Sequence, residues 1–518
     1  MTFQASDKQK AVWDFLENGK GSAVIEAVAG SGKTTTIVKG LERMPSTLRM
    51  VFLAFNKSIA EELKERVPSN VMARTFNSLG WAAVKKRFNL NPSDIEGNKV
   101  RRLAREIMTE DEDDLFDEVV KLVSLSKAFG MVPATTGLRG RFSDKEDNWY
   151  GLISRFDLDV DADDLGLVVK RAREVASASA KETDKVDYDD QLLFPLIYDI
   201  RMPRFDVVFV DEAQDVSFVQ LAMLGKILRA GGRLVAVGDT HQAIYGFRGA
   251  DSASMARIGE RFDAKTLPLS ITYRCARNIV RMAQTVMPSI EPAEKAPDGD
   301  VYGLASYGAS DFTAEDMVVC RNTAPLVALC YRLIGNGNPA RVLGKDIGAG
   351  MKALIKKLKP KGVYGVHGLR EKLDAWEKKE RAKWIEKDKE DKADAVTDRA
   401  DTLRTIIDAL ERRLGGGKVT VPAVEDEIDA LFEGKDKDTR PRTTLCTVHK
   451  SKGLEADRVF VLDPFLMPSQ RATQDWQKAQ EDNLIYVAYT RAKSALVFIR
   501  SSDFESDTKR AASSAGAA

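Results

Sequence analysis

The stretch AVAGSGKTTT, Ala27 to Thr36, decides the fold of this chain. An apolar run, Ala23 to Ile25, precedes it and is typical of a buried strand, and TTTIVKGLERM at its end has helical spacing. A glycine-rich loop between a strand and a helix presents backbone N–H groups and the positive end of the helix dipole to a phosphate. The pattern therefore predicts a nucleotide-phosphate loop, in which Lys33 reaches the β- and γ-phosphates and the Thr34 hydroxyl holds Mg²⁺.

A loop this short also fits a kinase or a GTPase, so the class of nucleotide-binding protein must be inferred from the motifs that follow. The usual pattern starts with glycine where this chain has Ala27, but Gly30 and Gly32 still free the backbone. The apolar strand in FDVVFVDEAQD delivers Asp211 and Glu212 at its carboxyl end. One carboxylate there can hold Mg²⁺ while the other orients and deprotonates a water molecule.

Composition sets broad bounds on the chain. Its 518 residues are too many for one core, and 43% hydrophobic with 30% charged residues are typical of a globular protein. There is no apolar run of membrane-spanning length and no apolar signal segment, so we expect a cytoplasmic protein, nucleoid-associated or, if from a phage, in the host cytoplasm. The scattered cysteines and histidines argue against a zinc site. A net charge of +1 neither supports nor excludes DNA as a partner.

Two charged helical regions interrupt the α/β pattern. We expect an α/β domain from residues 1–85 and 186–262 with a helical insertion at 86–185 between its parts. A second α/β domain is expected from residues 263–345 and 441–505, with a short charged helical insertion at 346–440. The last residues, 506–518, have the composition of a disordered tail.

Nine motifs, taken in order, resemble those of the superfamily 1 helicases of the UvrD/Rep/PcrA type, with some likeness to the F-box-helicase branch. The motifs are the Gln9 motif, GSGKTT, LAFNKS, TFNS, VDEAQD, GDTHQAIYGFRGAD, TYR, TVHKSKGLE and YVAYTRAK. The resemblance implies an α/β fold of two RecA-like P-loop domains with parallel sheets, 1A and 2A. Each carries a mainly helical insertion subdomain, 1B and 2B, and the two charged regions lie where those insertions fall.

The resemblance also assigns the nucleotide site. Gln9 would read adenine, Tyr273 would stack on it, and Glu455 would hold the ribose. The phosphate loop would comprise Ala29, Gly30, Ser31, Gly32, Lys33, Thr34 and Thr35. Thr34 and Asp211 would bind Mg²⁺. The catalytic set would be Lys33, Asp211, Glu212, the γ-phosphate sensor Gln242, and the arginine fingers Arg274 and Arg491, which come from the second domain.

The same resemblance implies a track for single-stranded DNA, because aromatic stacking and backbone contacts hold a strand of any sequence. Its expected members are Phe55, Thr75, Phe76, Asn77, Tyr245, Phe247, Arg248, Arg321 and His449. Phe55 and Phe76 could instead be core aromatics. Asn77 and Phe247 replace the His and Trp usual in the family, but both can contact DNA.

These residues together predict an ATP- and Mg²⁺-dependent helicase that moves 3′→5′ on single-stranded DNA and unwinds duplex. Its expected partners are single strands, junctions of single and double strands, and replication or repair proteins, and we expect a monomer that binds no membrane. One alternative is a translocase that strips proteins from single strands or remodels RNA without processive unwinding. Another is a nucleotide-gated binding module with vestigial hydrolysis, which the intact catalytic set argues against.

Overall fold

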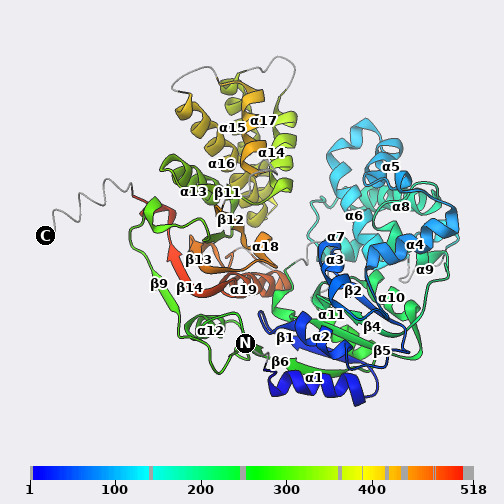
Figure 1. Ribbon diagram of the computed structural model, residues 1–518. Coiled ribbons are helices and arrows are strands. Elements are labelled where there is room, and N and C mark those ends of the chain that lie inside the picture. The colour runs from blue at the N-terminus through cyan, green and yellow to red at the C-terminus, as the bar shows by residue number, and fades with distance from the viewer. Residues whose placement is uncertain are drawn as a thin grey trace. The chain divides into compact units, whose positions relative to one another are not determined.

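A computed structural model gives the fold of the protein (Figure 1). It describes residues 4–138, 144–244, 253–359, 365–387, 389–414, 419–432, 441–470, 472 and 474–505. The chain divides into two compact units, residues 1–270 and 271–518. The predicted tail at 506–518 lies outside the described residues.

The first unit is built on a six-stranded sheet in the order β3-β2-β4-β5-β1-β6. Every pair of neighbouring strands is parallel. The strands are β1 (Ala23–Ala27), β2 (Met50–Ala54), β3 (Val71–Thr75), β4 (Phe205–Val210), β5 (Leu228–Gly238) and β6 (Lys265–Leu269). Because all six run the same way, the residues that follow each strand meet at one edge of the sheet, its carboxyl edge.

Both faces of this sheet are buried, which explains its nearly continuous apolar strands. In β2, Met50 and Phe52 pack on one face, and Val51 and Leu53 pack on the other. The first face is covered by α1 (Asp7–Asn18), α2 (Lys33–Leu41) and α3 (Lys57–Arg66). The second is covered by α4 (Phe76–Phe88), α9 (Asp190–Ile197), α10 (Phe218–Ile227) and α11 (Ser254–Arg261).

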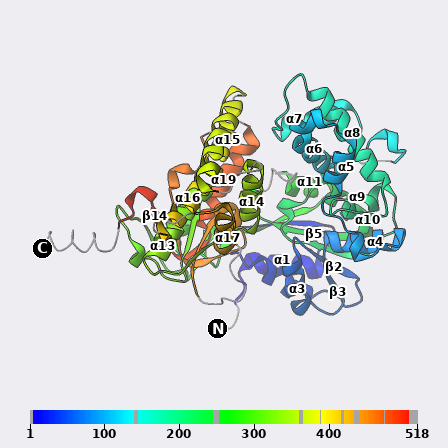
Figure 2. The same ribbon diagram turned by 90° about the horizontal axis from the view of Figure 1, so that it is seen from above.

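A helical subdomain is inserted between α4 and α9. It consists of α5 (Lys99–Ile107), α6 (Phe116–Phe129), α7 (Glu146–Arg155) and α8 (Leu165–Lys181). These helices gather on one side of the first unit in Figure 2 and have a core of their own, which includes the fully buried Trp149. Apart from buried residues such as Lys99 and Lys127, the charged side chains of this region lie on the outer faces of a small bundle.

The second unit has its own six-stranded parallel sheet, in the order β11-β12-β10-β13-β14-β9. Its strands are β9 (Asp300–Gly303), β10 (Met317–Cys320), β11 (Ala340–Val342), β12 (Thr443–Thr447), β13 (Ala456–Leu462) and β14 (Ala492–Ile499). A separate parallel pair is formed by β7 (Ile271–Thr272) and β8 (Glu291–Pro292). The helices of this α/β part are α12 (Arg277–Ala283), α13 (Thr323–Gly335), α18 (Val448–Ser451) and α19 (Asp475–Tyr489).

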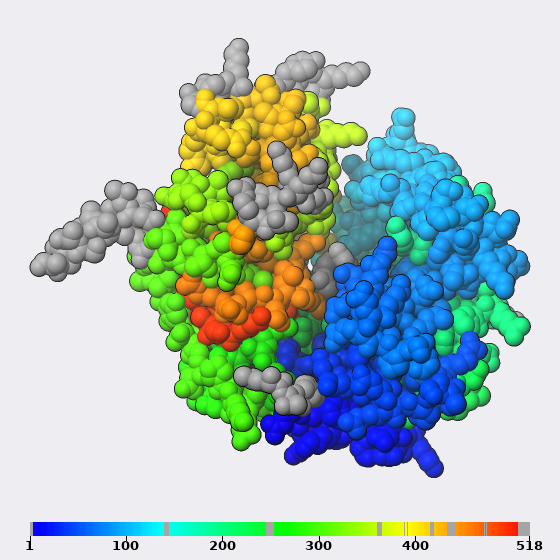
Figure 3. Space-filling view, viewed as in Figure 1, coloured from blue at the N-terminus to red at the C-terminus, as the bar shows by residue number. Residues whose placement is uncertain are grey.

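A second helical segment lies between β11 and β12. It contains α14 (Lys345–Leu358), α15 (Val366–Glu386), α16 (Glu390–Arg413) and α17 (Val421–Phe432). Its yellow and gold surface stands at the end of the second unit in Figure 3. Leu369 of α15 and Ile406 of α16 belong to the same hydrophobic cluster as Leu445 of β12, so this segment shares a continuous core with the sheet.

The predicted fold class is confirmed, since both units are parallel α/β sheets that carry helical insertions. One detail differs from the expected division at residue 262. The strand β6 pairs with β1 at the edge of the first sheet, so the first unit extends to Ser270. Among the described helices, none combines the length and the apolar character that crossing a bilayer requires.

Candidate nucleotide and DNA site

The glycine loop after β1 has the backbone of a phosphate-binding turn. Gly30 and Gly32 adopt positive φ angles of 72° and 74°, a left-handed conformation that other residues rarely take. Gly32 is the N-cap residue of α2 and has no side chain that could accept a hydrogen bond. The first backbone N–H groups of α2 are therefore not capped by a side chain of the N-cap residue. The buried Ser31 hydroxyl has no hydrogen-bond partner among the described residues. These polar groups suit a phosphate.

Lys33 begins α2 and faces the carboxylates that follow β4. Its Nζ lies 3.3 Å from Oε1 of Glu212. Burial favours the neutral amine, but the negative charges of Glu212, Asp211 and Asp239 outweigh it and raise the pKa of Lys33. The lysine is therefore held as a cation where the phosphates of a nucleotide would lie.

The turn after β4 aims Glu212 at this lysine. Glu212 adopts a left-handed backbone with φ of 49°, which is uncommon for a residue with a side chain. Its N–H donates to Oδ1 of Asp211 at 2.9 Å. The two carboxylates that the sequence placed at the end of this strand thus occupy one tight turn, with Asp211 buried.

The structure adds Gln214, a residue that sequence reasoning missed. Its side-chain amide donates to Oε2 of Glu212, and its Oε1 accepts from the N–H of Asp239 at 3.0 Å. The amide of Gln242 in turn donates to Oδ2 of Asp239 at 2.7 Å. A Cβ on Gly238 would lie only 2.4 Å from the Gln214 oxygen, so this close approach requires glycine. These hydrogen bonds, through Gln214 and Asp239, connect Glu212 to Gln242.

Thr34, Thr35 and Gln9 lie at the same loop. Thr34 and Thr35 are half-buried in the first turn of α2. Gln9 is buried, donates through Nε2 to Oγ1 of Thr36 at 3.0 Å and accepts from the N–H of Ser6 at 3.1 Å. This ties α1 to the phosphate loop and places the Gln9 amide beside it.

The donor set for Mg²⁺ is small. Thr34 and Asp211 both follow strands of the first sheet at its carboxyl edge. Over the described ranges, no group of three or more His, Cys, Asp and Glu side chains forms a metal site. One hydroxyl and one carboxylate fit Mg²⁺, which usually keeps several waters and binds substrate phosphates.

In the second unit, two of the predicted nucleotide-site residues, Arg274 and Glu455, form an ion pair that Lys493 joins. Tyr273 is 46% exposed. Oε2 of Glu455 lies 2.7 Å from Nε of Arg274, and Oε1 of Glu455 lies 3.0 Å from Nζ of Lys493. Burial opposes ionisation of Glu455, but the hydrogen bond from Lys493 and the charge of Arg274 outweigh it and lower its pKa.

Arg491 is only 1% exposed. Its Nε donates to the carbonyl of Val487 and its Nη1 to the carbonyl of Leu454, both at 3.0 Å. Arg274 also donates to this region, through Nη1 to the carbonyl of Thr490 at 3.1 Å. Both predicted fingers therefore have internal hydrogen bonds in the second unit, and the Arg491 side chain supports the packing of that unit.

Comparison with known protein families agrees with this geometry. The UvrD/REP helicase N-terminal domain matches residues 7–263, and the UvrD-like helicase C-terminal domain matches residues 345–503. The chain belongs to the UvrD-like helicases of superfamily 1. The residues matched include every predicted nucleotide-site residue except Tyr273 and Arg274.

Individual relatives are distant. F-box DNA helicase 1 of Gallus gallus is 23% identical over 96% of this chain and 49% of the relative. F-box DNA helicase protein 1 of Schizosaccharomyces pombe is 24% identical over 95% of this chain and 57% of the relative. The ATP-dependent DNA helicase PcrA of Staphylococcus epidermidis is 25% identical over 54% of this chain and 39% of the relative. This UvrD-like helicase thus spans about half the length of its F-box relatives.

The predicted DNA residues of this UvrD-like helicase fall into different environments. Phe55 follows β2 and is 46% exposed, and Thr75 caps α4 by accepting from the N–H of Ser78. Phe76, in contrast, is buried in the core cluster between α4 and the sheet. This environment favours the alternative that Phe76 is a core aromatic. Phe76 is the first residue of α4, and its ring packs into the core beneath that helix.

Two further predicted contacts are already bonded to protein groups. The Asn77 amide donates to the carbonyl of Tyr188 at 2.8 Å. The guanidinium of Arg321 makes a bidentate ion pair with Glu481, at 2.8 Å for the closest pair of atoms. His449 lies half-buried in α18. Tyr245, Phe247 and Arg248 lie outside the described residues.

The bond from Asn77 points to Tyr188, an aromatic that the sequence interpretation passed over. Tyr188 is 61% exposed, although the residues on both sides of it are buried or half-buried. It sits in the sequence VDYDD, and an aromatic between acidic residues ahead of a helix was the available signal. An exposed ring at the carboxyl edge of the sheet is suited to stacking on a base.

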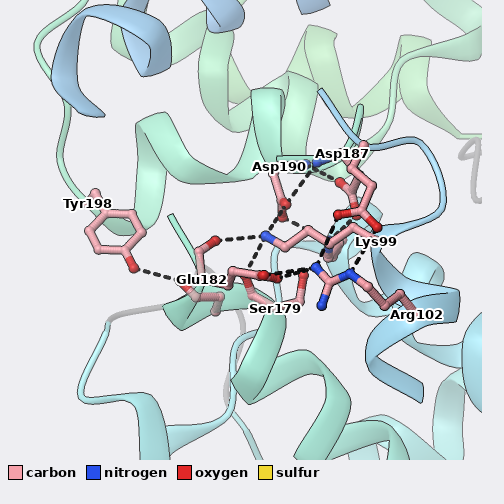
Figure 4. A network of polar contacts seen from close by, with 10 residues as sticks. Lys99, Arg102, Ser179, Glu182, Asp187, Asp190 and Tyr198 are labelled. Atoms are coloured by element: carbon pink, nitrogen blue, oxygen red, sulfur yellow. Dashed lines mark hydrogen bonds and ion pairs between the residues drawn. The ribbon is translucent and has the colours of Figure 1, made fainter. Parts of the chain in front are cut away.

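Tyr188 lies between Asp187 and Asp190, which take part in a network of buried polar contacts (Figure 4). Nζ of Lys99 lies 2.8 Å from Oδ2 of Asp190 and also donates to the carbonyls of Ser179 and Glu182. Nζ of Lys127 lies 2.8 Å from Oδ1 of Asp190 and also pairs with Asp187. Helices α5, α6, α8 and α9 therefore converge on one charged cluster at the base of the inserted subdomain.

This cluster makes stability depend on pH. Burial and the neighbouring charge of Asp187 raise the pKa of Asp189 to about 7, from a reference value of 3.8. The folded state thus retains a proton that the unfolded chain releases, so this residue's contribution to stability is lost as pH rises from about 4 to about 7. We expect Asp189→Asn to raise the melting temperature at pH 8 more than at pH 5, and the exposed Asp184→Asn to change neither. Equal shifts for both variants would contradict this assignment.

Proposed function

We propose that this chain is an ATP-driven motor that moves 3′→5′ on single-stranded DNA and unwinds duplex DNA. The observation that carries the proposal is the pairing of Lys33 with Glu212 at the glycine loop, extended through Gln214 and Asp239 to Gln242. A cation for the phosphates, a carboxylate for water and a sensing amide are the parts that phosphoryl transfer to water needs.

The residues suggest how hydrolysis would proceed. A triphosphate is a strong acceptor for the Lys33 ammonium, so binding would release Glu212 to accept a proton from the attacking water. Gln214 would keep the Glu212 carboxylate oriented while this happens. Mg²⁺, held by Thr34 and Asp211, would supply charge neutralisation of the β- and γ-phosphates when bound.

For the second unit, we propose the roles that the family resemblance implies. Tyr273 and Glu455 would bind the base and the ribose, together with Gln9 from the first unit. Arg274 and Arg491 would stabilise negative charge on the transferring phosphoryl group. Each arginine would then have to exchange some of its present internal bonds during the catalytic cycle.

The proposed single-strand track combines Phe55, Thr75 and Tyr188 of the first unit with Arg321 and His449 of the second. Phe247 and its neighbours in the same motif are proposed members as well. Asn77 acts in this scheme as a positioning residue, because its amide holds the main chain of Tyr188. The alternative, a translocase that clears proteins from single strands or remodels RNA, would use the same residues.

The deciding experiment measures ATP hydrolysis with and without single-stranded DNA, and strand separation on duplexes with either a 3′ or a 5′ tail. We expect hydrolysis to be stimulated by single-stranded DNA and unwinding to require the 3′ tail. Stimulated hydrolysis with no unwinding of either duplex would favour the protein-clearing alternative. Hydrolysis that ignores DNA would overturn the motor proposal.

Tyr188→Ala tests the track directly. Loss of one stacked base should weaken binding of single-stranded DNA by about 1–3 kcal/mol, while DNA-free hydrolysis and the melting temperature stay unchanged because the ring is exposed. Fluorescence anisotropy with a labelled oligonucleotide measures the loss. The matched control is Phe465→Ala, an equally exposed aromatic of the second unit. Identical affinities for the two variants would remove Tyr188 from the track.

A further inference from the structure

A groove of about 1110 Å³ lies on the first unit, away from the predicted site residues. Arg49 lines it just ahead of β2, Arg204 just ahead of β4, and Arg229 at the start of β5. In a parallel sheet the starts of the strands share one edge, so the groove lies at the amino edge. The glycine loop, Glu212 and Gln242 follow strands and lie at the opposite, carboxyl edge.

The groove is strongly basic. Seven of its lining residues are Lys or Arg and one, Asp199, is acidic, although the whole chain has a net charge of only +1. Lys226 pairs with Asp199, and Arg229 pairs with Asp206. The excess of positive charge in this groove is therefore a local feature.

Four of the cations lack a carboxylate partner. Lys86, Arg87, Arg201 and Arg204 are exposed, and within the described part of the chain none of them forms an ion pair. Arg49, in contrast, donates its N–H to the Asp206 carboxylate at 2.8 Å. Like charges gathered on one surface repel one another and favour an anionic ligand. Four unpaired cations around one groove thus mark a binding surface for several negative charges at once.

The lining also indicates which anion fits. Sites for small molecules are mostly apolar and enclose their ligand, whereas half of this lining is Lys or Arg. Sites for single strands supply aromatic platforms for the bases, and no aromatic residue lines this groove. A cationic lining without aromatic platforms suits the sugar-phosphate backbone of a duplex, whose bases are stacked inside.

We propose that this groove binds the phosphate backbone of duplex DNA, at a surface separate from the single-strand track. The inference rests on the proposed DNA motor and adds a second contact with its substrate. Strand β4 connects the two surfaces, because Arg204 immediately precedes it and Asp211 immediately follows it. Duplex bound at the amino edge would thus be held by the same strand that carries the catalytic carboxylates.

The test compares two double variants of the full chain. Arg201→Gln with Arg204→Gln removes two exposed groove cations. Lys20→Gln with Lys265→Gln removes two exposed cations outside the groove, one ahead of β1 and one at the first position of β6, so both variants lose the same net charge. Binding of a blunt-ended duplex is measured by fluorescence anisotropy over a series of salt concentrations, beside single-strand binding and single-strand-stimulated hydrolysis.

We expect the groove variant to bind duplex roughly tenfold more weakly at low salt, and its slope of log affinity against log salt to be shallower by about 2 than that of the parent chain. The control variant should retain the parent affinity and slope. Single-strand binding and stimulated hydrolysis should be unchanged in both.

Equal duplex affinity for the groove and control variants, or no duplex binding by the parent chain, would overturn the proposal. An equal loss of single-strand and duplex binding would overturn it too, since the groove would then not be a duplex surface. Failure of the motor proposal would give a different result, because hydrolysis would then not respond to single-stranded DNA. Even in that case, loss of duplex binding in the groove variant but not in the control variant would support the proposal that the groove binds duplex DNA.

Discussion

Glu212→Gln is expected to lower the rate of ATP hydrolysis by roughly 10²- to 10⁴-fold, the usual contribution of a general base. Glutamine keeps the size of the side chain but cannot accept the proton of the attacking water. Nucleotide affinity should be unchanged or tighter, because a negative charge beside the phosphates is removed. Steady-state hydrolysis and binding of a fluorescent nucleotide measure the two effects separately.

Glu65→Gln is the matched control, since Glu65 is an exposed residue of α3 with no ion pair in the described structure. It should hydrolyse ATP at the parent rate. If Glu212→Gln retained near-parent hydrolysis, another group would have to activate the water. Loss of nucleotide binding in Glu212→Gln would instead show that the pairing with Lys33 builds the phosphate site itself.

The nucleotide site predicted for the first unit depends on local rules. A glycine loop after a strand and carboxylates at the end of another strand can be read from short stretches. In a parallel sheet these ends must meet at one edge. The placement of Lys33 opposite Glu212 follows from that rule and needs no further information.

Other features depend on contacts that a linear reading does not show. Gln214 is recognised only when the close approach of Gly238 and the turn at Glu212 are seen together. Phe76 reads equally well as a surface or a core aromatic until the cap at Thr75 fixes where α4 begins. Both assignments depend on the geometry of a turn.

The basic groove is invisible in the sequence for a different reason. Its cations are scattered from Arg49 to Arg229, and nearby acidic residues keep the net charge close to zero. Only the sheet order, which brings the starts of β2, β4 and β5 together, gathers them on one surface. Charge clusters of this kind are products of topology.

Arg491→Ala is expected to cause two separable losses. Its guanidinium donates to the carbonyls of Val487 and Leu454 inside the second unit, and it is almost fully buried. Removing it would leave these acceptors unpaired beside a cavity, at a cost of about 3–5 kcal/mol in the stability of that unit. If Arg491 also acts as an arginine finger, hydrolysis by the molecules that remain folded should fall by roughly 10³-fold or more.

Arg274→Ala and Arg491→Lys separate these effects. Arg274 is more exposed and pairs with Glu455, so its loss should lower the hydrolysis rate with a smaller change in melting temperature. Lysine at position 491 keeps the charge but not the planar, multiply donating head group, so we expect partial stability and a low rate. Melting is followed by calorimetry, and hydrolysis is measured well below the transition. A large melting shift in Arg491→Ala with a normal rate per folded molecule would leave Arg491 with a structural role only, because a finger cannot be removed without slowing the chemical step.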